Sequence, residues 1–521
     1  MTAPAKVTYV SLSADDPATD AAFGTAIAEA RGALGATAPL EIAGERRAGA
    51  GVIESRSPTD MRVVVARVTA AGADDVRDAV AAARAAFPAW SARPFTERAT
   101  IIERAAELVR ARRFELSVWM ILEMGKNRVE ALGEIEETAD LLHYYAGQLR
   151  ANGGYVRPMD RLAPTDDNTS VLRPYGVWAV IAPWNFPYAL LGAPVAAALV
   201  TGNTVVCKPS SETPLSAVKL AEIFHAAGVP KGALTCLPGS GRVVGDGLGD
   251  HPDVAGVTFT GSYDVGFKLY QRFSRPFPKP AIIEMGGKNP ALVMASADVA
   301  QAVQGIYRSA FGMNGHKCSA CSRVYVHRAV ADQLLAGLVK AADGVAPADP
   351  LDKGVFVGPV ATKQSYEDYQ RYAGVARAAG AVRAGAAVIT DGDKAHGYFV
   401  RPTVLAGLPR GHELLREELF VPIVAVQAVD SLDEALAEAN DTKFGLTAGL
   451  FSREQKEVDT FFDRIEAGVT YVNRAAGATT GAWPGVQPFG GWKGSGSTGK
   501  NIGGLYTLPC YLREQSRTVV R

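Results

Sequence analysis

The sequence predicts an α/β protein with a doubly wound parallel sheet followed by a second α/β domain. Short apolar runs alternate with helical stretches between Gly176 and Glu284, which is typical of such a sheet. A second alternation follows Cys318. Polar and glycine residues come directly after the apolar runs of the first region. Doubly wound sheets bind ligands beyond these strand ends, so we expect a ligand site there.

Length, composition and charge fit a folded protein of several units. The chain has 521 residues, of which 48% are hydrophobic and 21% charged, and such a length corresponds to about three domains. The 54 Lys and Arg residues balance 54 Asp and Glu residues, so no basic field attracts phosphate backbones or anionic lipid. We expect no nucleic acid and no membrane as partners.

The cysteines and the N-terminus favour a reducing compartment. Five cysteines in a chain of this length differ from the disulfide framework of a small secreted protein. Pro4, Lys6 and two aspartates interrupt residues 1–20, which leaves no apolar stretch of signal-peptide length. We therefore expect a cytoplasmic protein.

The N-terminal third is expected to form an extension and two amphipathic helices. Residues 1–45 have weak periodicity and are interpreted as a surface-packed extension. Apolar residues recur at helical spacing in two later stretches, namely Val76, Val80, Ala83 and Phe87 behind the candidate caps Asp74 and Asp75, and Ile101, Ala105 and Leu108.

One stretch imitates a membrane span. No charged residue lies between Arg173 and Lys208, a length greater than the ~20 residues that cross a bilayer. Three prolines, at 183, 187 and 194, interrupt it, which favours a buried strand at 177–182 and a small-residue helix at 190–200 over a membrane helix.

The remaining apolar runs predict the strands of both domains. In the first region they lie at 204–207, 233–237, 256–259 and 281–284, with a helix at 214–227. After Cys318 they lie at 324–326, 422–426, 446–451 and 468–472. The final run, 511–520, is extended in character, and we expect it to pair with a neighbouring subunit.

Two glycine motifs give weak evidence. The segment Gly494–Lys500 has the spacing of a P-loop, but Asn501 stands at the magnesium-binding position and no apolar strand precedes the segment. The segment Gly239–Gly245 resembles a dinucleotide fingerprint with one residue too many. We interpret the first as a false match and the second as evidence that is weak by itself.

Cys318 is the strongest candidate for chemistry. It follows Lys317 and lies near His316 and Arg323, and positive neighbours lower a thiol pKa and favour a nucleophilic thiolate. A buried, inert cysteine is an equal alternative on this stretch alone. Cys321 makes a CxxC pair, but a zinc site would need a second ligand pair and a redox site would need a thioredoxin-like context.

Several motifs together resemble the NAD(P)-dependent aldehyde dehydrogenase superfamily, from about Pro39 to the C-terminus. They are Pro183–Pro187 (PWNFP), Lys208-Pro209, Phe259–Ser262, Glu284–Lys288 (EMGGK), Gly315 with Cys318, Glu417–Phe420 and Pro488–Gly491. The resemblance implies a Rossmann-type NAD(P)-binding domain (46–160 and 176–283), a catalytic domain (284–476), a substrate anchor loop with the return to the cofactor domain (477–504) and a small β oligomerisation element (161–175 and 505–521). It also implies a homodimer or a dimer-based assembly.

The resemblance assigns the catalytic roles. Cys318 attacks the aldehyde carbon, and the Asn185 amide with the Cys318 backbone N–H stabilises the oxyanion. Glu284 activates the water that hydrolyses the thioester. Without the resemblance, Asn185 reads as a turn residue and Glu284 as a strand-end carboxylate. No metal is expected.

The resemblance also assigns a cofactor site, without deciding between NAD and NADP. Lys208 and Glu418 match the positions that hold ribose hydroxyls. Gly261 and Ser262 match the pyrophosphate site at a helix N-terminus. Ser211 stands where glutamate is frequent in strict NAD enzymes, so NADP remains open beside NAD. The remaining cofactor-binding positions are Trp184 and Phe420.

Within the superfamily, the chain most resembles the branch that oxidises L-glutamate γ-semialdehyde (1-pyrroline-5-carboxylate) in proline catabolism. The substrate carboxylate would be held by Ser319, Gly481 and Ala482, with the aromatic residues Phe489 and Phe186 beside it. Departures from this branch lie near the pocket, at His316, Val421, Trp483, Pro484 and a longer segment 473–481. The alternatives are another aliphatic or aromatic aldehyde and a catalytically silent member of the fold.

Overall fold

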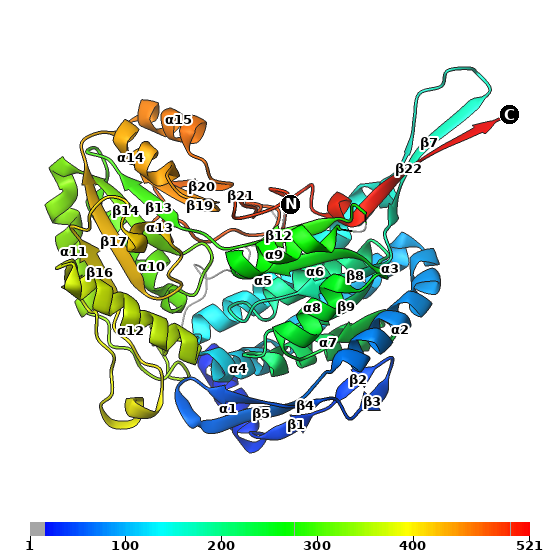
Figure 1. The fold of residues 1–521 in the computed structure, drawn as a ribbon, viewed down its shortest axis with the longest axis horizontal. Helices are drawn as coiled ribbons and strands as arrows, with labels where there is room; N and C mark the ends of the chain where they lie inside the picture. The colour runs from blue at the N-terminus through cyan, green and yellow to red at the C-terminus, as the bar shows by residue number, and fades with distance from the viewer. Residues whose placement is uncertain (1–15, 276, 501) are drawn as a thin grey trace.

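The computed structural model describes residues 16–275, 277–500 and 502–521. They form two sheets, each covered by helices, and a protruding β-ribbon (Figure 1). Most of the segment 1–20, on which the prediction of no signal peptide rests, lies outside these residues. Both sheets are mainly parallel, so the predicted α/β class is confirmed.

The first sheet has five parallel strands in the order β10-β9-β8-β11-β12. Every apolar run predicted here forms one of them: β8 (Val177–Ile181), β9 (Thr204–Lys208), β10 (Leu234–Cys236), β11 (Val254–Thr260) and β12 (Ala281–Glu284). Alternate side chains enter two different cores. Strands covered on both faces are apolar throughout, which is why this sheet could be read from the sequence.

Helices cover both faces of this sheet. One face lies against α3 (Phe95–Ala111), α4 (Arg113–Met124), α5 (Arg128–Ala151), α6 (Ala189–Val200) and α7 (Pro214–Ala227). The other lies against α2 (Ala73–Ala92), α8 (Asp246–Asp250) and α9 (Tyr263–Phe273). As predicted, Val76, Val80 and Ala83 are buried on α2, and the Asp75 carboxylate accepts the Gly72 N–H at its start.

The second sheet has seven strands in the order β15-β16-β17-β14-β13-β19-β20. Its strands are β13 (Asn289–Val293), β14 (Cys321–His327), β15 (Val382–Ala384), β16 (Thr403–Ala406), β17 (Ile423–Val429), β19 (Thr447–Phe451) and β20 (Val469–Val472). Its helices are α10 (Val299–Phe311), α11 (Ala331–Asp343), α12 (Lys363–Ala378), α13 (Glu413–Arg416), α14 (Leu432–Asn440) and α15 (Gln455–Arg464). The sequence reading found four of these strands and missed β13, β15 and β16.

Smaller sheets complete the fold. The ribbon holds β6 (Val156–Pro158), β7 (Asp166–Pro174) and β22 (Leu512–Val520), and β22 pairs antiparallel with β7 of the same chain (Figure 1). A separate three-stranded sheet joins β1 (Ala36–Ala38), β4 (Gly51–Ser57) and β5 (Asp60–Ala70). The strands β2 (Leu40–Ile42) and β3 (Glu45–Arg47) form a hairpin, and β18 (Phe444–Gly445) pairs antiparallel with β21 (Trp492–Lys493), which is distant in the sequence.

The N-terminal segment contains a helix that weak periodicity did not predict. Helix α1 (Pro17–Gly32) begins behind Asp16, whose carboxylate accepts the N–H groups of Ala18 and Thr19. Its buried residues Phe23 and Ile27 join the core of the first sheet. Helix α1 therefore contributes to that core.

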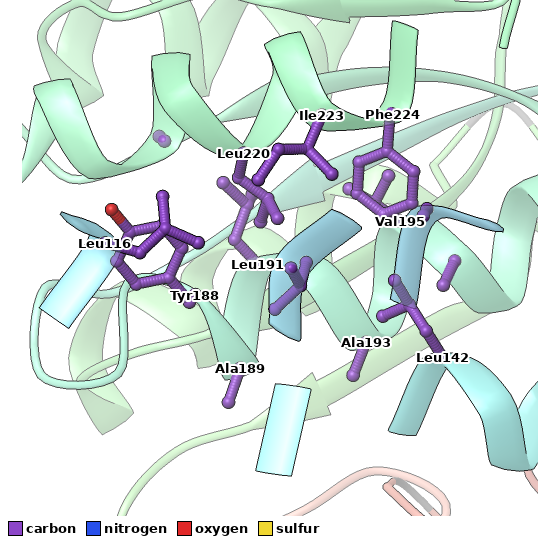
Figure 2. Packing of buried hydrophobic residues seen from close by; sticks show 14 of the residues in the cluster. Leu116, Leu142, Tyr188, Ala189, Leu191, Ala193, Val195, Leu220, Ile223 and Phe224 are labelled. Carbon is purple, nitrogen blue, oxygen red and sulfur yellow. The ribbon is translucent and has the colours of Figure 1, made fainter. Parts of the chain in front are cut away.

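The charge-free stretch is the centre of the first core. Figure 2 shows Leu191 and Val195 of α6 surrounded by Leu116, Leu142, Leu220 and Phe224 from α4, α5 and α7. Every residue of α6 is buried, so protein rather than lipid covers it. Among the described residues, no helix is long and apolar enough to span a membrane.

The two glycine motifs adopt different structures. The described part of Gly494–Lys500 runs along β12, where Ser497 Oγ accepts the Ile283 N–H, and no helix follows it. A P-loop needs a strand, a loop and then a helix, so this match is false; Asn501 lies outside the described residues. The segment Gly241–Gly245 forms a π-helical turn leading into α8.

A buried ion pair stabilises the turn that follows β8. Lys126 Nζ pairs with the Glu134 carboxylate, and both side chains are fully buried. The Glu134 carboxylate also accepts the N–H groups of Tyr188 and Ala189 at the start of α6. The Lys126 ammonium lies 3.8 Å from the Phe186 ring centroid. These contacts fix the turn on both sides.

We expect Lys126→Met to destabilise the protein by about 3–5 kcal/mol, because it leaves the buried Glu134 carboxylate without its cation. Thermal unfolding followed by circular dichroism should show a large fall in the midpoint temperature of the first unfolding transition. Arg77→Met is the matched control, since the Arg77–Asp74 pair is exposed at 68% and 82% and such pairs contribute little. Equal midpoint temperatures for the two variants would contradict the stabilising role of the Lys126–Glu134 pair.

Candidate active site

A left-handed turn presents Cys318 at the seam between the two sheets. After α10, Met313, Asn314 and Gly315 all have positive φ values of 50°, 55° and 71°. A Cβ on Gly315 would lie 2.5 Å from the Val421 carbonyl oxygen, so only glycine fits. Non-glycine residues in this conformation store backbone strain that the surrounding structure must hold. The turn places Cys318 ahead of β14.

Asn289 holds the loop from the other side. Its Nδ2 donates to the carbonyl oxygens of Cys318 (2.7 Å) and Ala320 (2.9 Å), and its Oδ1 accepts the Thr447 N–H. A Cβ on Gly287 would lie 2.8 Å from the Cys318 carbonyl oxygen. Sequence reasoning missed Asn289, because an asparagine at a strand start gives no signal by itself.

Glu284 faces the Cys318 thiol. The end of β12 places Glu284 at 0% exposure, and its carboxylate accepts a hydrogen bond from the thiol. Burial, followed by the charges of Glu284 and Glu418, raises the pKa of Cys318 well above its usual value. The expectation of a lowered thiol pKa is therefore wrong.

The positive neighbours in the sequence do not lower the pKa of the thiol, because burial and the charges of Glu284 and Glu418 outweigh the interaction of Cys318 with Lys317. Burial lowers the pKa of His316 to about 3, so the ring is neutral. Lys317 Nζ donates to the Arg308 carbonyl oxygen. Burial lowers its pKa to about 8, although Glu130 opposes this shift. The local sequence predicted charge near Cys318 without showing where the side chains point.

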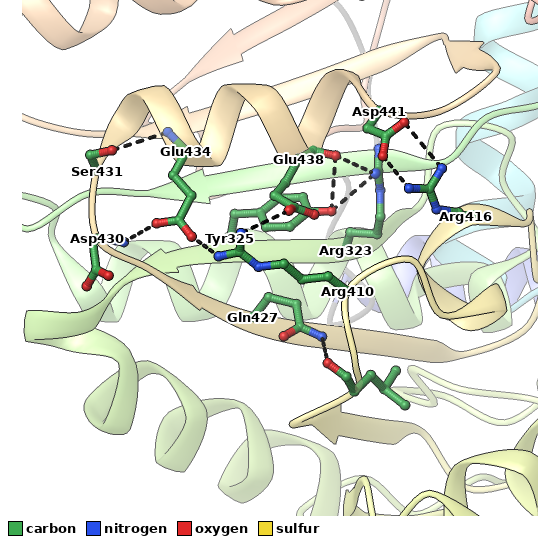
Figure 3. Close-up of polar contacts among 11 residues, drawn as sticks. Arg323, Tyr325, Arg410, Arg416, Gln427, Asp430, Ser431, Glu434, Glu438 and Asp441 are labelled. Atoms are coloured by element: carbon green, nitrogen blue, oxygen red, sulfur yellow. Dashed lines mark hydrogen bonds and ion pairs between the residues drawn. The ribbon is translucent and has the colours of Figure 1, made fainter.

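Arg323 has a structural role in the second domain (Figure 3). Its guanidinium donates to the carbonyl oxygens of Lys288, Glu438 and Ala439 and to the Tyr325 hydroxyl. It therefore ties β14 to the start of β13 and the end of α14. The neighbouring Cys321 is 1% exposed, and its thiol donates to the Arg323 carbonyl oxygen.

The thiol-redox and metal alternatives receive no support. All five cysteines are free thiols. The described part of the chain contains no group of three or more His, Cys, Asp or Glu side chains placed to hold a metal ion.

Asn185 lies in the turn after β8, next to the nucleophile loop. Its Nδ2 donates to the His316 carbonyl oxygen at 3.0 Å, and the side chain is 3% exposed. The Trp184 ring meets His316 edge-on at 4.8 Å and Phe420 edge-on at 5.6 Å. The structure thus brings together the predicted residues Asn185, Trp184 and Phe420 around the Cys318 loop.

Lys208 and Ser211 lie at the end of β9. The Lys208 ammonium donates to the Pro209 carbonyl oxygen and retains further donors. Burial lowers its pKa to about 8. The Ser211 hydroxyl donates to the Gly239 carbonyl oxygen at 3.2 Å. Lys208 therefore offers donors for sugar hydroxyls, whereas the Ser211 hydroxyl is already engaged.

The N-terminus of α9 fits an anionic group. Ser262 is its N-cap residue, and the Ser262 side chain makes no capping hydrogen bond. The first N–H groups of a helix attract anions such as phosphate. Gly261 precedes this end, and its N–H donates to the Glu284 carbonyl oxygen, which connects the helix start to β12.

Glu418 lies against the crossing between the two sheets. Its carboxylate accepts the Gly287 N–H at 2.8 Å, and a Cβ on Gly286 would lie 2.3 Å from it. Burial raises the pKa of Glu418 to about 8. Phe420, two residues further along the chain, has a left-handed backbone conformation (φ 56°). Lys208, the α9 N-terminus and Glu418 together fit the ribose hydroxyls and pyrophosphate of a dinucleotide.

A cavity of about 890 Å³ opens beside Cys318. All five predicted substrate residues line it, namely Phe186, Ser319, Gly481, Ala482 and Phe489. The Thr479 hydroxyl donates to the Ser319 carbonyl oxygen at 2.6 Å and contacts Ser309 Oγ at 2.8 Å. This bridge joins the segment 477–504 to the nucleophile loop, and sequence reasoning missed it because both hydroxyl residues are ordinary.

Of the departures noted in the sequence, Trp483, Pro484 and part of the segment 473–481 line this cavity, whereas His316 and Val421 do not. Trp483 Nε1 donates to Asp140 Oδ2 at 2.7 Å, which fastens the loop to α5. Val421 is 4% exposed and His316 is fully buried. His316 also stacks on Phe420 with ring centroids 5.9 Å apart. Trp483 and Pro484 thus belong to the cavity wall, whereas His316 and Val421 are buried beside the loop that carries Cys318.

A cysteine at the seam of two α/β layers, next to a buried carboxylate and a dinucleotide-type site, defines a thiol-dependent oxidoreductase. Residues 46–516 match the model of the aldehyde dehydrogenase family. The chain belongs to this family.

The chain is similar to several characterised members. It is 38% identical over 503 residues to the 1-pyrroline-5-carboxylate dehydrogenase of Geobacillus sp. strain WCH70, covering 96% of this chain and 95% of the relative. The crystal structure of 1-pyrroline-5-carboxylate dehydrogenase from Thermus with bound NAD matches with a TM-score of 0.94, 33% identity and 100% coverage of both chains.

Proline utilization A from Bdellovibrio bacteriovorus, inactivated by N-propargylglycine, matches with a TM-score of 0.91 and 33% identity. The match covers 96% of this chain and 52% of that one. This chain therefore spans about half the length of that protein.

We expect iodoacetamide to alkylate Cys318 slowly at neutral pH and faster as pH rises. The thiolate is the reactive form, and it appears only above the raised pKa. Glu284→Gln removes a negative charge that disfavours the thiolate, so its rate profile should move to lower pH. Mass spectrometry of the Cys318 peptide across about pH 6 to 10 measures both profiles. A wild-type midpoint below that of free cysteine would contradict the assignment.

Proposed function

We propose that this protein oxidises L-glutamate γ-semialdehyde to L-glutamate with NAD, the second step of proline catabolism. The observation that carries the proposal is the shared cavity of Cys318 with Ser319, Gly481 and Ala482. Its similarity to 1-pyrroline-5-carboxylate dehydrogenases along almost the whole chain supports it.

Cys318 is the nucleophile in this proposal. Because the thiol donates to Glu284, the carboxylate accepts the proton as sulfur attacks the aldehyde carbon. The negative charge then develops on the former carbonyl oxygen. The Asn185 amide, held by the His316 carbonyl oxygen, and the Cys318 backbone N–H stabilise that oxyanion.

Lys208, Ser262 and Glu418 would hold the cofactor. When bound, NAD supplies the hydride acceptor that turns the thiohemiacetal on Cys318 into a thioester. After Glu284 has released the thiol proton to water, its carboxylate acts as the general base for the water that hydrolyses the thioester.

The substrate carboxylate binds at the far wall of the cavity. Gly481 and Ala482 offer backbone N–H groups, and Ser319 offers a hydroxyl. Short side chains allow an anion to approach such donors closely. Phe186 and Phe489 lie along the aliphatic part of the substrate.

Assembly and location complete the proposal. The edge strand β22 and the ribbon that it forms with β7 provide the contact of a homodimer or of a dimer-based assembly. The proposed location of the reaction is the cytoplasm.

An uncharged aliphatic or aromatic aldehyde is the second candidate substrate. The cavity of about 890 Å³ is much larger than a five-carbon substrate needs. Longer substrates would therefore fit beside the same catalytic residues.

Steady-state kinetics separate the two candidates. We expect kcat/KM for L-glutamate γ-semialdehyde to exceed that for uncharged aldehydes by at least about tenfold, or ~1.4 kcal/mol of transition-state discrimination. NADH and NADPH formation are measured in parallel. If uncharged aldehydes are oxidised with higher kcat/KM, the chemistry stands and the proposed substrate is wrong.

Glu284→Gln should slow deacylation, because the amide cannot activate water. We expect an acyl-enzyme on Cys318 to accumulate, detected as an added mass after rapid acid quench. The Cys318→Ala variant is the control that forms no such adduct and should retain cofactor binding. An unchanged turnover rate of Glu284→Gln would remove Glu284 from the mechanism.

A further inference from the structure

We propose that Arg474 is a positioning residue that sets the preference for a carboxylate-bearing aldehyde by orienting the Gly481–Ala482 peptide. The inference rests on the proposed function and deepens it. Arg474 follows β20 and lines the cavity beside Cys318. It is placed to act on the loop rather than on the thiol.

The guanidinium connects two points of the loop. Its Nη2 donates to the Gly481 carbonyl oxygen at 2.6 Å, and its Nη1 donates to Gln487 Oε1 at 3.2 Å. The Gln487 amide donates in turn to the Thr470 carbonyl oxygen of β20. Both ends of the segment 481–487 are thereby tied to one strand.

The Arg474 side chain is itself held in place. Its guanidinium carbon lies 4.7 Å from the centroid of the Tyr471 ring, a cation–π distance. A planar fork that is fixed by an aromatic ring and two acceptors loses little further freedom. Arg474 is therefore a rigid support for Gly481.

The geometry of a peptide bond transmits this contact to the cavity. No described peptide bond is cis, and in a trans peptide the carbonyl oxygen and the next N–H point in opposite directions. Because the Gly481 carbonyl oxygen faces Arg474, the Ala482 N–H points away from Arg474. That N–H donates to no group of residues 16–275, 277–500 and 502–521, and it is left for a ligand.

Gly481 is matched to Arg474. Its φ is +105°, and a Cβ would lie 2.5 Å from Arg474 Nη2. A side chain at this position would push the guanidinium away and release the carbonyl. The close approach therefore depends on both residues.

The test compares Arg474→Met with Arg474→Lys. Methionine removes the donors, so kcat/KM for L-glutamate γ-semialdehyde should fall about 10- to 100-fold, mainly through KM. For an uncharged aldehyde such as pentanal it should change less than about threefold. Lysine can still donate to Gly481 and should restore part of the loss. Calorimetric titration with L-glutamate gives the same comparison without turnover.

Arg308→Met is the matched comparison, because Arg308 also lines the cavity and its side chain makes no hydrogen bond to the loop among the described residues. An equal loss in Arg308→Met would show that cavity charge, not peptide orientation, sets the preference, and would overturn the inference. Adding Gly481→Ala to wild type should reproduce the Arg474→Met defect. In the Arg474→Met background the clash with the guanidinium is gone and only the strain of an alanine at φ +105° remains, so Gly481→Ala should cost less there than in wild type.

The outcomes distinguish a failure of the proposed function from a failure of the proposed role of Arg474. A wild-type enzyme without preference for the semialdehyde refutes the proposed function. A wild-type preference that survives unchanged in Arg474→Met, with an unchanged L-glutamate affinity, refutes only the role of Arg474. Thermal unfolding of each variant shows whether it is folded.

Discussion

The active site depends on a four-residue crossing between the two sheets. The chain leaves the edge strand β12 at Glu284 and enters β13, inside the second sheet, at Asn289. So short a connection fixes the end of one sheet against the start of the other. Glu284 then faces the thiol, and the Asn289 amide holds the carbonyl oxygens of Cys318 and Ala320. The proposed base ends a strand of the first sheet and the proposed nucleophile precedes a strand of the second, yet the crossing fixes one against the other.

Burial at this seam keeps ionisable groups close to neutral. It raises the pKa values of Cys318 and Glu418 and lowers those of Lys208 and Lys288, the latter to about 7. Lys208, Lys288 and Glu418, with pKa values of about 7 to 8, can exchange protons near neutral pH. The Cys318 thiol instead stays protonated, so it does not persist as a free anion that would be open to oxidation. In the proposed mechanism it becomes nucleophilic when Glu284 accepts its proton.

The sequence predicted the elements that depend on local residue patterns. All five strands of the first sheet were predicted because parallel strands covered on both faces are uniformly apolar. Strand β13 was missed because it directly follows the motif at Glu284–Lys288 with no intervening helix. The sign of the Cys318 pKa shift was wrong because adjacency in sequence did not determine the direction of Lys317 or Arg323. Asn289, Thr479 and Arg474 escaped notice because their roles arise only from long-range contacts.

Chemistry and specificity reside on different kinds of structure. Cys318, Glu284 and Asn185 lie at strand ends and tight turns that the cores of two sheets hold in place. The carboxylate-facing loop is instead held by a few side-chain contacts, from Arg474, Thr479 and Trp483. Substitutions in that loop can reshape the cavity at small cost to the cores, whereas changes at the crossing would move the base relative to the nucleophile. Of the departures from the semialdehyde branch, Trp483 and Pro484 fall on the cavity side of this division, whereas His316 lies on the other side, because its carbonyl oxygen holds the Asn185 amide.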